Sequence, residues 1–132
     1  MSSFNLDIVT PIKELKVAAV SYVRCPGIDG AFGIMNKHRE GIFALNVGEL
    51  KITRDGKDEY FATGGGFAEV MDSSVKLLVE SIESSKEINV DRAQESFERA
   101  KVRKSENDPD INFTRAEASL LRALNRLRVS RR

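Results

Sequence analysis

The chain has 132 residues, of which 41% are hydrophobic and 31% are charged, so it can form one large or two small domains with a real core. A single Cys excludes a disulfide framework, and one Cys with one His argues against a dedicated zinc site. No apolar run is long enough to span a membrane, so any membrane role is expected to be through a partner. The net charge of +1 is unevenly divided, because residues 1–111 hold 15 Lys and Arg against 19 Asp and Glu, whereas residues 112–132 hold six Arg and one Glu. This basic C-terminal segment is expected to find acidic groups in the protein or on a partner.

Residues 1–84 carry the pattern of short β-strands. Phe4, Leu6 and Ile8 alternate with polar residues, as in a strand with one buried face. Asp55-Gly56, between two strand-like segments, is a strong β-hairpin signal. Turn residues recur about every 8–12 positions, which is typical of an antiparallel sandwich or barrel. Further strand-like segments are residues 14–23, 42–47, 49–53 and 75–79.

Two glycine-containing segments predict local backbone features in this half. Cys25-Pro26-Gly27 is predicted to be a turn, in which Cys25 is a small packed residue. Gly64-Gly65-Gly66 is not followed by the Gly-Lys-Ser/Thr of a phosphate-binding loop. We therefore expect a bulge or a close approach of two strands at the triple glycine.

A third segment holds three glycines at intervals of three, between residues 27 and 33. No helical pattern follows them, so they are not a dinucleotide-binding fingerprint. We expect a surface loop whose apolar tip exposes Ile28 and Phe32 as a docking site. His38 has no second His or Cys beside it and is expected to lie at a contact surface.

The pattern becomes helical after a polar linker at residues 83–87. Asn89 is the expected N-cap of a first helix, and Pro109 within residues 107–110 ends it. Thr114 and Glu117 have the spacing of a capping box for a second helix. Two helices joined by a short loop predict an antiparallel hairpin. The expected apolar stripes are Val90, Ala93, Phe97 and Ala100 on the first helix, and Ala116, Leu120, Ala123, Leu124 and Leu127 on the second.

Arg-Ala pairs with one spacing dominate the helical part. Arg92-Ala93 precedes Arg99-Ala100 by seven residues, and Arg115-Ala116 precedes Arg122-Ala123 by the same interval, with Arg126 one turn further. Seven residues are about two helical turns, so each set of arginines shares a helix face while the alanines allow two helices to approach closely. If the hairpin folds back, these guanidinium groups can surround a polyphosphate; if it extends, they can pair with carboxylates of another protein.

A solvated helix face is the alternative use of these arginines, with salt bridges to Glu95, Glu98 and Glu117. For Arg128, Arg131 and Arg132, a solvated face or an acidic partner surface is the preferred interpretation. The spacing by itself leaves these uses open. No nucleophile stands beside an obvious base, so no catalytic residue is expected.

Several segments together resemble the epsilon subunit of the bacterial F-type ATP synthase. The resemblance covers the whole chain in order, including its length and its strand-then-helix layout, and is more specific than any single motif. The segments that carry it are FNLDIVTP at residues 4–11, GAFGIM at 30–35 with His38, GGGFAEV at 64–70, INVDRA at 88–93, NFTRAE at 112–117 and ALNRL at 123–127.

The resemblance implies an α+β fold, with an antiparallel β-sandwich of about ten strands over residues 1–84 and a regulatory two-helix hairpin over residues 85–132. It implies a non-catalytic subunit of the central stalk, which turns with the gamma subunit and the c-ring while proton flow drives ATP synthesis. The subunit would belong to the F1 sector, peripheral to the cytoplasmic face of the bacterial cell membrane. In the family, the hairpin is either compact on the sandwich or extended towards the alpha/beta catalytic subunits, and the extended form blocks ATP hydrolysis. We expect the isolated protein to be monomeric.

The resemblance also implies which residues make contacts. Several members of the family bind ATP as a regulatory ligand in the compact form, with Mg²⁺ as a candidate companion, and no required cofactor or metal site is implied. The ATP contacts fall on Glu83, Ile88, Asn89, Arg92, Ala93, Arg99, Arg122 and Arg126. The c-ring and gamma contacts fall on Ile28, Asp29, Ala31, Phe32 and His38. The inhibitory contacts to the catalytic subunits fall on Arg115, Arg122, Arg126 and Arg128.

One position departs from the ATP-binding pattern of the family, which is Ile/Leu-Asp-x-x-Arg-Ala. Asn89 stands where the pattern has Asp. Asn caps a helix about as well as Asp, but its amide group adds donors where the carboxylate offers only acceptors. We expect this to weaken nucleotide binding by about 1–2 kcal/mol, the value of one altered hydrogen bond. Asp91 does not substitute, because helical residues two apart point to different faces.

Two other classes of function use the same features. A nucleic-acid-binding module would rely on the Arg-rich tail, but Phe113 is the only aromatic residue after Phe97 and the rest of the chain is acidic, so no nucleic-acid partner is expected. A β-sandwich adaptor outside the synthase would share the fold but would not bind gamma-type or c-type subunits.

Overall fold

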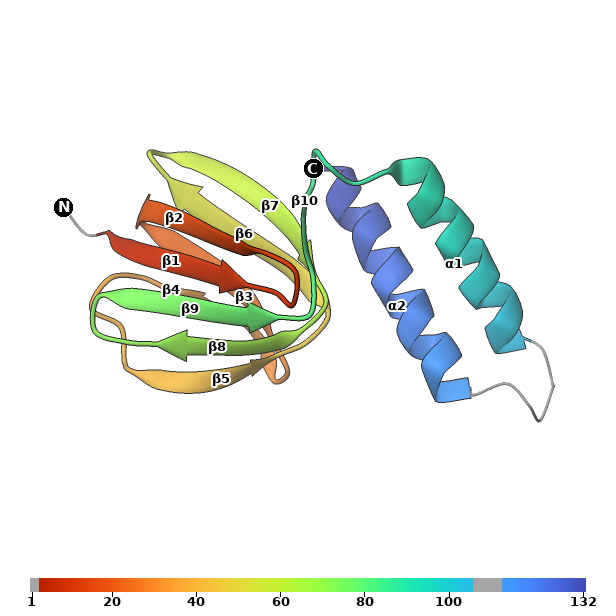
Figure 1. Cartoon of the computed structure of the whole chain (residues 1–132), viewed down its shortest axis with the longest axis horizontal. Coiled ribbons are helices and arrows are strands. Elements are labelled where there is room, and N and C mark those ends of the chain that lie inside the picture. The colour runs from red at the N-terminus through yellow and green to blue at the C-terminus, as the bar shows by residue number, and fades with distance from the viewer. Residues whose placement is uncertain (1–2, 106–112) are drawn as a thin grey trace.

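The computed structural model describes residues 3–105 and 113–132, which form ten β-strands followed by two α-helices (Figure 1). This confirms the predicted α+β architecture. The strands are β1 (Phe4–Val9), β2 (Glu14–Val20), β3 (Tyr22–Gly27), β4 (Gly30–Ile34), β5 (Gly41–Leu45), β6 (Gly48–Arg54), β7 (Lys57–Thr63), β8 (Gly66–Val70), β9 (Ser74–Val79) and β10 (Ile82–Ser84). The helices are α1 (Val90–Ser105) and α2 (Phe113–Ser130).

The strands form one continuous sheet that folds over into two layers. Its order is β10-β7-β6-β3-β5-β8-β9-β1-β2, with β4 paired to β3 beside this path. The fold occurs where β3 and β5 share a single pair, Gly27 with Leu45, and it brings β2 back against β6. Neighbouring strands are antiparallel except β1 and β9, which run parallel.

The core lies between the two layers and is built by strand alternation. Leu6 and Ile8 of β1 are fully buried in one layer, and Leu50 and Ile52 of β6 are buried in the same core from the facing layer. Each inward residue alternates with a more exposed one because successive side chains of a strand point to opposite faces. Burying four such side chains contributes roughly 1.5–3 kcal/mol each to the free energy of folding.

Glycines act at two tight places in the sandwich. Asp55 and Gly56 have φ angles of 52° and 71°, which makes the β6–β7 connection a two-residue hairpin turn as predicted. Gly66 lies so close to β9 that an added Cβ would be 1.9 Å from the Leu78 carbonyl oxygen. The expected close strand approach at the triple glycine is therefore present.

The predicted turn at Cys25-Pro26-Gly27 is wrong, because these residues lie within β3 and the turn is formed by Ile28 and Asp29. Pro26 fits in the strand because its neighbour Gly48 has no side chain, and a Cβ there would come within 2.4 Å of Pro26 Cβ. Cys25 is buried, as expected.

The helical part also differs from prediction in three places. Glu83 and Ser84 belong to β10, so the linker before α1 begins after them. Val90 is 51% exposed and does not belong to the apolar stripe of α1. Thr114 is the second residue of α2 rather than its cap. The predicted helix end at residues 107–110 lies outside the described residues.

The helical hairpin docks on the sandwich through α2, which lies between α1 and the sheet (Figure 1). A second apolar cluster joins the two parts. It contains Ala62 of β7, Ile88 before α1, Ala93 of α1, and Leu127 and Val129 of α2, with Tyr60 and Phe97 packed against it. This cluster is much smaller than the sandwich core, so the hairpin is the less firmly held element.

Candidate functional site

The four alanines of the Arg-Ala pairs form the contact between α1 and α2. Ala93, Ala100, Ala116 and Ala123 are all buried. Small side chains at these positions let the two helix backbones approach closely, and the neighbouring arginines are carried to the rim of the contact.

A groove of about 360 Å³ runs between the two helices and is rich in arginine. Four guanidinium groups and two hydroxyl groups surround it, and none of its described lining residues is acidic. Nη2 of Arg99 donates to Ser96 Oγ at 3.3 Å, and Nη2 of Arg122 donates to Ser119 Oγ at 3.1 Å. The lining residues are Ser96, Arg99, Ala100, Arg103, Ser119, Arg122, Ala123 and Arg126.

A second hollow of about 370 Å³ lies between α2 and the sandwich. It shares Arg122 and Arg126 with the interhelical groove but also contains the carboxylates of Glu83 and Glu87. Its further lining residues are Lys13, Val47, Ala62, Thr63, Gly64, Ser81, Ile82 and Asn125. Arg122 and Arg126 therefore lie between two spaces: a groove whose only charged lining residues are arginines, and a hollow that also contains carboxylates.

Glu83 and Arg126 bind each other where the hollows meet. Nε and Nη2 of Arg126 donate to Oε1 and Oε2 of Glu83 at 2.8 and 3.0 Å. This two-point hydrogen bond raises the pKa of Arg126 above its ordinary value, against the lowering effect of partial burial. The pair links α2 to β10 at the edge of the groove.

The Ile88–Ala93 segment is mainly structural in this conformation. Ile88 and Ala93 are buried in the cluster that docks the hairpin. Asn89 caps α1, with its Oδ1 accepting a hydrogen bond from the Arg92 backbone N–H at 3.0 Å. The Arg92 side chain is exposed and lines neither of the two hollows.

Several lining residues were not predicted. Ser96 and Ser119 each precede a predicted arginine by three residues, and this helical spacing puts each serine on the same face as its arginine. Asn125 donates from Nδ2 to the Gly48 carbonyl oxygen at 2.9 Å and fixes α2 on β6. Lys13 gave no signal, because only the fold brings the β1–β2 turn to this hollow.

The five residues predicted to contact partner subunits line a single separate groove of about 600 Å³ at the β3–β4 turn. Ile28 is 60% exposed, as expected for an apolar tip. Phe32 is only partly exposed, because its ring packs on the core and lies 5.3 Å from that of Phe43. The exposed apolar surface comes instead from Ile42, which is 72% exposed, and Phe43. The predicted residues in the groove are Ile28, Asp29, Ala31, Phe32 and His38.

His38 is held in the loop after β4 by two contacts. Its Nδ1–H donates to the Met35 carbonyl oxygen, and its ring meets that of Phe4 edge to face at 5.7 Å between centroids. Nε2 is buried without a hydrogen-bond partner among the described residues. These contacts position the imidazole as part of the groove wall.

The arginines predicted to reach catalytic subunits lie along α2. Arg115 and Arg128 are exposed, while Arg122 and Arg126 line the interhelical groove. Two arginines of α2 and its end make salt bridges to the sandwich: Arg126 binds Glu83 and Arg132 binds Glu49. The alternative of pairing with the helical glutamates does not hold for these two residues.

Within residues 3–105 and 113–132, no cluster of three His, Cys, Asp or Glu side chains suits a metal ion. Over the same part of the chain, no helix combines the length and hydropathy needed to cross a membrane.

Comparison with known families places both halves of the chain. Residues 3–85 match the model of the ATP synthase delta/epsilon chain β-sandwich domain, and residues 86–131 match that of its long α-helix domain. The chain is 40% identical over 127 residues to the ATP synthase epsilon chain of Nitratidesulfovibrio vulgaris (strain DP4), covering 96% of this chain and 95% of the relative. It is 40% identical over 130 residues to that of Syntrophomonas wolfei, covering 98% and 95%.

Solved structures show the same fold at lower sequence identity. A chain of the Euglena gracilis mitochondrial ATP synthase, in an OSCP/F1/c-ring structure, superposes with a TM-score of 0.81 at 21% identity, over 92% of this chain and 77% of that one. A chain of the Tetrahymena thermophila mitochondrial ATP synthase central stalk and c-ring superposes with a TM-score of 0.63 at 19% identity, over 98% and 94%.

Proposed function

This chain belongs to the delta/epsilon family of ATP synthase subunits, as a non-catalytic epsilon subunit, and from that premise we propose that it is a central-stalk subunit with a regulatory helical hairpin. In this role it couples the catalytic alpha/beta head to the c-ring of a proton-translocating F-type enzyme. It acts as a peripheral protein on the cytoplasmic face of a bacterial membrane, held there by the complex, and is monomeric when isolated.

The groove at the β3–β4 turn supports the stalk role. Ile28 and Ile42 are large apolar side chains that remain exposed beside one hollow, and such a patch marks a protein contact surface. Asp29 and Arg39 at the same groove supply polar contacts around the apolar centre. We assign the gamma and c-ring contacts to this surface.

The arginine groove carries the proposal for a nucleotide. Four guanidinium groups line this space and no carboxylate does; Arg126 is paired with Glu83, so Arg99, Arg103 and Arg122 carry the charge offered to a polyphosphate. The adjoining hollow contains acceptor groups on Glu83 and Glu87 and suits the base and ribose. We propose that ATP, with or without Mg²⁺, binds across both spaces, with Arg122 and Arg126 at the junction.

ATP bound in this way would favour the compact hairpin. Its contacts would come from α1, α2 and the sandwich together, and these are assembled only when the hairpin is docked. A ligand shifts an equilibrium by its difference in affinity for the two states. ATP would therefore hold back the extended form, in which Arg115, Arg122, Arg126 and Arg128 would contact the catalytic subunits and block ATP hydrolysis.

Calorimetric titration of the isolated chain with ATP tests the nucleotide site. Arg122→Gln should lower the affinity at least tenfold, because Arg122 lines both hollows. Arg131→Gln is the matched control, since it removes the same charge from an exposed position outside both. Asn89→Asp should raise the affinity by about tenfold if the family's carboxylate contributes one stronger hydrogen bond. Failure of both the unmodified chain and Asn89→Asp to bind at millimolar ATP would remove the nucleotide from the proposal.

Deletion of residues 88–132 tests the inhibitory role in the assembled complex. The sandwich has its own core, so assembly and coupled ATP synthesis should persist while ATP hydrolysis rises. Unchanged hydrolysis would remove the inhibitory hairpin from the proposal and leave the stalk role standing. Loss of binding to gamma-type and c-type subunits would contradict the stalk role itself.

A further inference from the structure

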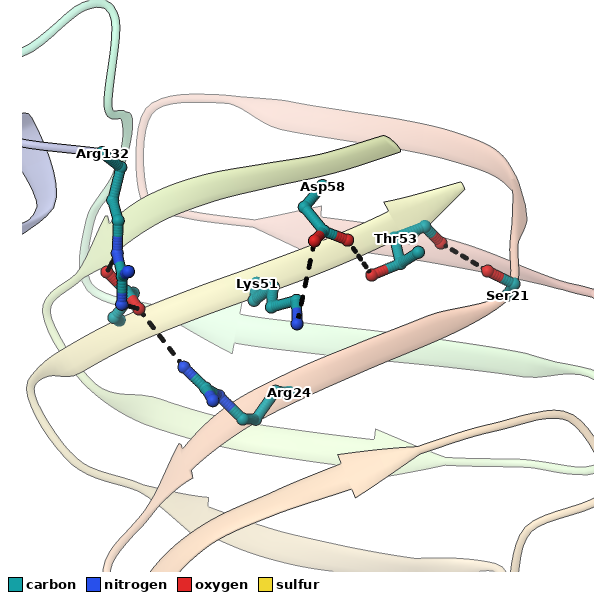
Figure 2. Close-up of polar contacts among 7 residues, drawn as sticks. Ser21, Arg24, Lys51, Thr53, Asp58 and Arg132 are labelled. Atoms are coloured by element: carbon teal, nitrogen blue, oxygen red, sulfur yellow. Dashed lines mark hydrogen bonds and ion pairs between the residues drawn. The ribbon is translucent and has the colours of Figure 1, made fainter. Parts of the chain in front are cut away.

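The C-terminal end of α2 meets the sandwich through a polar contact distinct from the arginine groove. Arg132 lies just beyond α2 and reaches down to β6, while Arg24 reaches the same place from β3 (Figure 2). Both guanidinium groups bind one carboxylate, that of Glu49. Glu49 and Arg132 line a hollow that includes neither Glu83 nor Arg126.

Glu49 and Tyr60 together bind the Arg132 guanidinium, one at its edge and the other at its face. Nε and Nη2 of Arg132 donate to the two Glu49 oxygens at 2.9 and 2.8 Å. The Arg132 guanidinium also lies over the Tyr60 ring, with Cζ 4.6 Å from the ring centroid. The Glu49 side chain is only 17% exposed, and Arg24 Nη2 lies 3.3 Å from its Oε1. A planar guanidinium can use its edge for the carboxylate and its face for the aromatic ring at once.

We propose that Glu49 and Tyr60 form a latch for Arg132, which holds the hairpin on the sandwich without any nucleotide. The inference rests on the proposed alternation between compact and extended hairpins, but not on ATP binding. Leu127 and Val129, between the arginine groove and the latch, are buried against the sandwich, so the latch closes one end of a continuous docking surface. Opening it is a required step whenever the hairpin extends.

Arg24 makes the latch readily reversible. When Arg132 leaves, Glu49 still has Arg24 as a cationic partner, so no partly buried carboxylate is left unpaired. Released Arg132 then joins exposed Arg128 and Arg131 as a basic end that can bind carboxylates elsewhere. Glu49 on the sandwich and the acidic surface of a partner thus compete for the same arginine.

Hydrogen exchange of the full chain, measured without nucleotide, tests the latch. Arg132→Gln should speed amide exchange across residues 121–130 by roughly fivefold, the value of one bidentate, partly exposed pair with a cation–π contact. Arg131→Gln removes the same charge one residue earlier, at an exposed position where the described residues give the side chain no hydrogen bond or ion pair, and should leave exchange unchanged. Amides of β1, β8 and β9 serve as the internal measure that the sandwich remains folded.

A double-mutant cycle identifies Glu49 as the partner. Glu49→Gln should speed exchange of the same α2 residues, and the Glu49→Gln/Arg132→Gln pair should add little to either single change. Raising NaCl from 0.05 to 0.5 M, about a threefold shortening of the screening length, should speed exchange in the unmodified chain more than in Arg132→Gln. Equal effects of Arg131→Gln and Arg132→Gln, or additive effects of Glu49→Gln and Arg132→Gln, would overturn the latch.

Discussion

Cys25 lies in β3 with its thiol buried in the sandwich core, and this burial raises its pKa to about 12. A buried thiol is protonated at neutral pH and is also screened from reagents, so two effects suppress its reactivity. We expect iodoacetamide at pH 8 to leave the native chain unmodified and to alkylate it fully in denaturant, as followed by mass spectrometry. Rapid alkylation of the folded chain would contradict the burial.

The same thiol predicts a pH dependence of stability. Above the ordinary pKa of 9.0, the unfolded chain loses the thiol proton while the folded chain keeps it until about 12. The unfolded state then binds fewer protons, so the free energy of unfolding falls as pH rises, by about 1.4 kcal/mol at pH 10. Urea titrations between pH 8 and 10.5 should show this slope, and Cys25→Ala should lack it whatever its absolute stability.

At the scale of the elements, the hairpin depends on the smallness of the alanines between its helices. Ala100→Leu inserts a branched side chain into the buried α1–α2 contact and should cost about 1–3 kcal/mol by forcing the helices apart. Lys101→Leu is the matched control, because Lys101 is exposed on the same helix. Hydrogen exchange should show the loss in α1 and α2 for the first variant and in neither for the second. Equal protection of both variants would show that the helices tolerate wider spacing.

The sequence predicted these elements where one rule dominated, and failed where two rules competed. Alternation placed β1, and the Asp55-Gly56 signal placed the β6–β7 turn. Pro26-Gly27 resembles a turn locally, yet it stays in a strand because Gly48 on a neighbouring strand makes room for the proline ring. That accommodation depends on a residue 22 positions away, which no local pattern contains.

The site shows the same division. Seven-residue spacing put Arg99 and Arg122 on the helix faces that line the interhelical groove, but it also grouped them with Arg92 and Arg115, which do not line it. Lys13 in the polar hollow and Glu49 at the latch could not be predicted, because both depend on how the sheet folds over and where α2 lands. Helix periodicity specifies a face but not the surface that the face meets.

At the scale of the whole molecule, the surfaces proposed for regulation and the surface proposed for attachment belong to different parts of the fold. The arginine groove and the latch lie on the hairpin and the β6–β7 side of the sandwich, whereas the apolar groove is lined by residues of the β3–β4 hairpin and β5. In the proposed mechanism, partner binding through the apolar groove would therefore leave the hairpin free to dock or extend. A rotor subunit with a regulatory arm needs this separation, since its attachment must persist while the arm changes position.

This separation makes a testable prediction for the attachment surface. Ile42→Asp places a charge where a 72% exposed isoleucine borders the apolar groove, and should weaken binding to a gamma-type partner at least tenfold in calorimetry. The free energy of unfolding of the isolated chain should change by no more than about 0.5 kcal/mol, because the side chain is exposed. Ile12→Asp, at a position 90% exposed and outside the groove, makes the same chemical change and should bind normally. Undiminished binding by Ile42→Asp would move the attachment surface elsewhere on the sandwich, and parallel loss in both variants would trace the effect to charge alone.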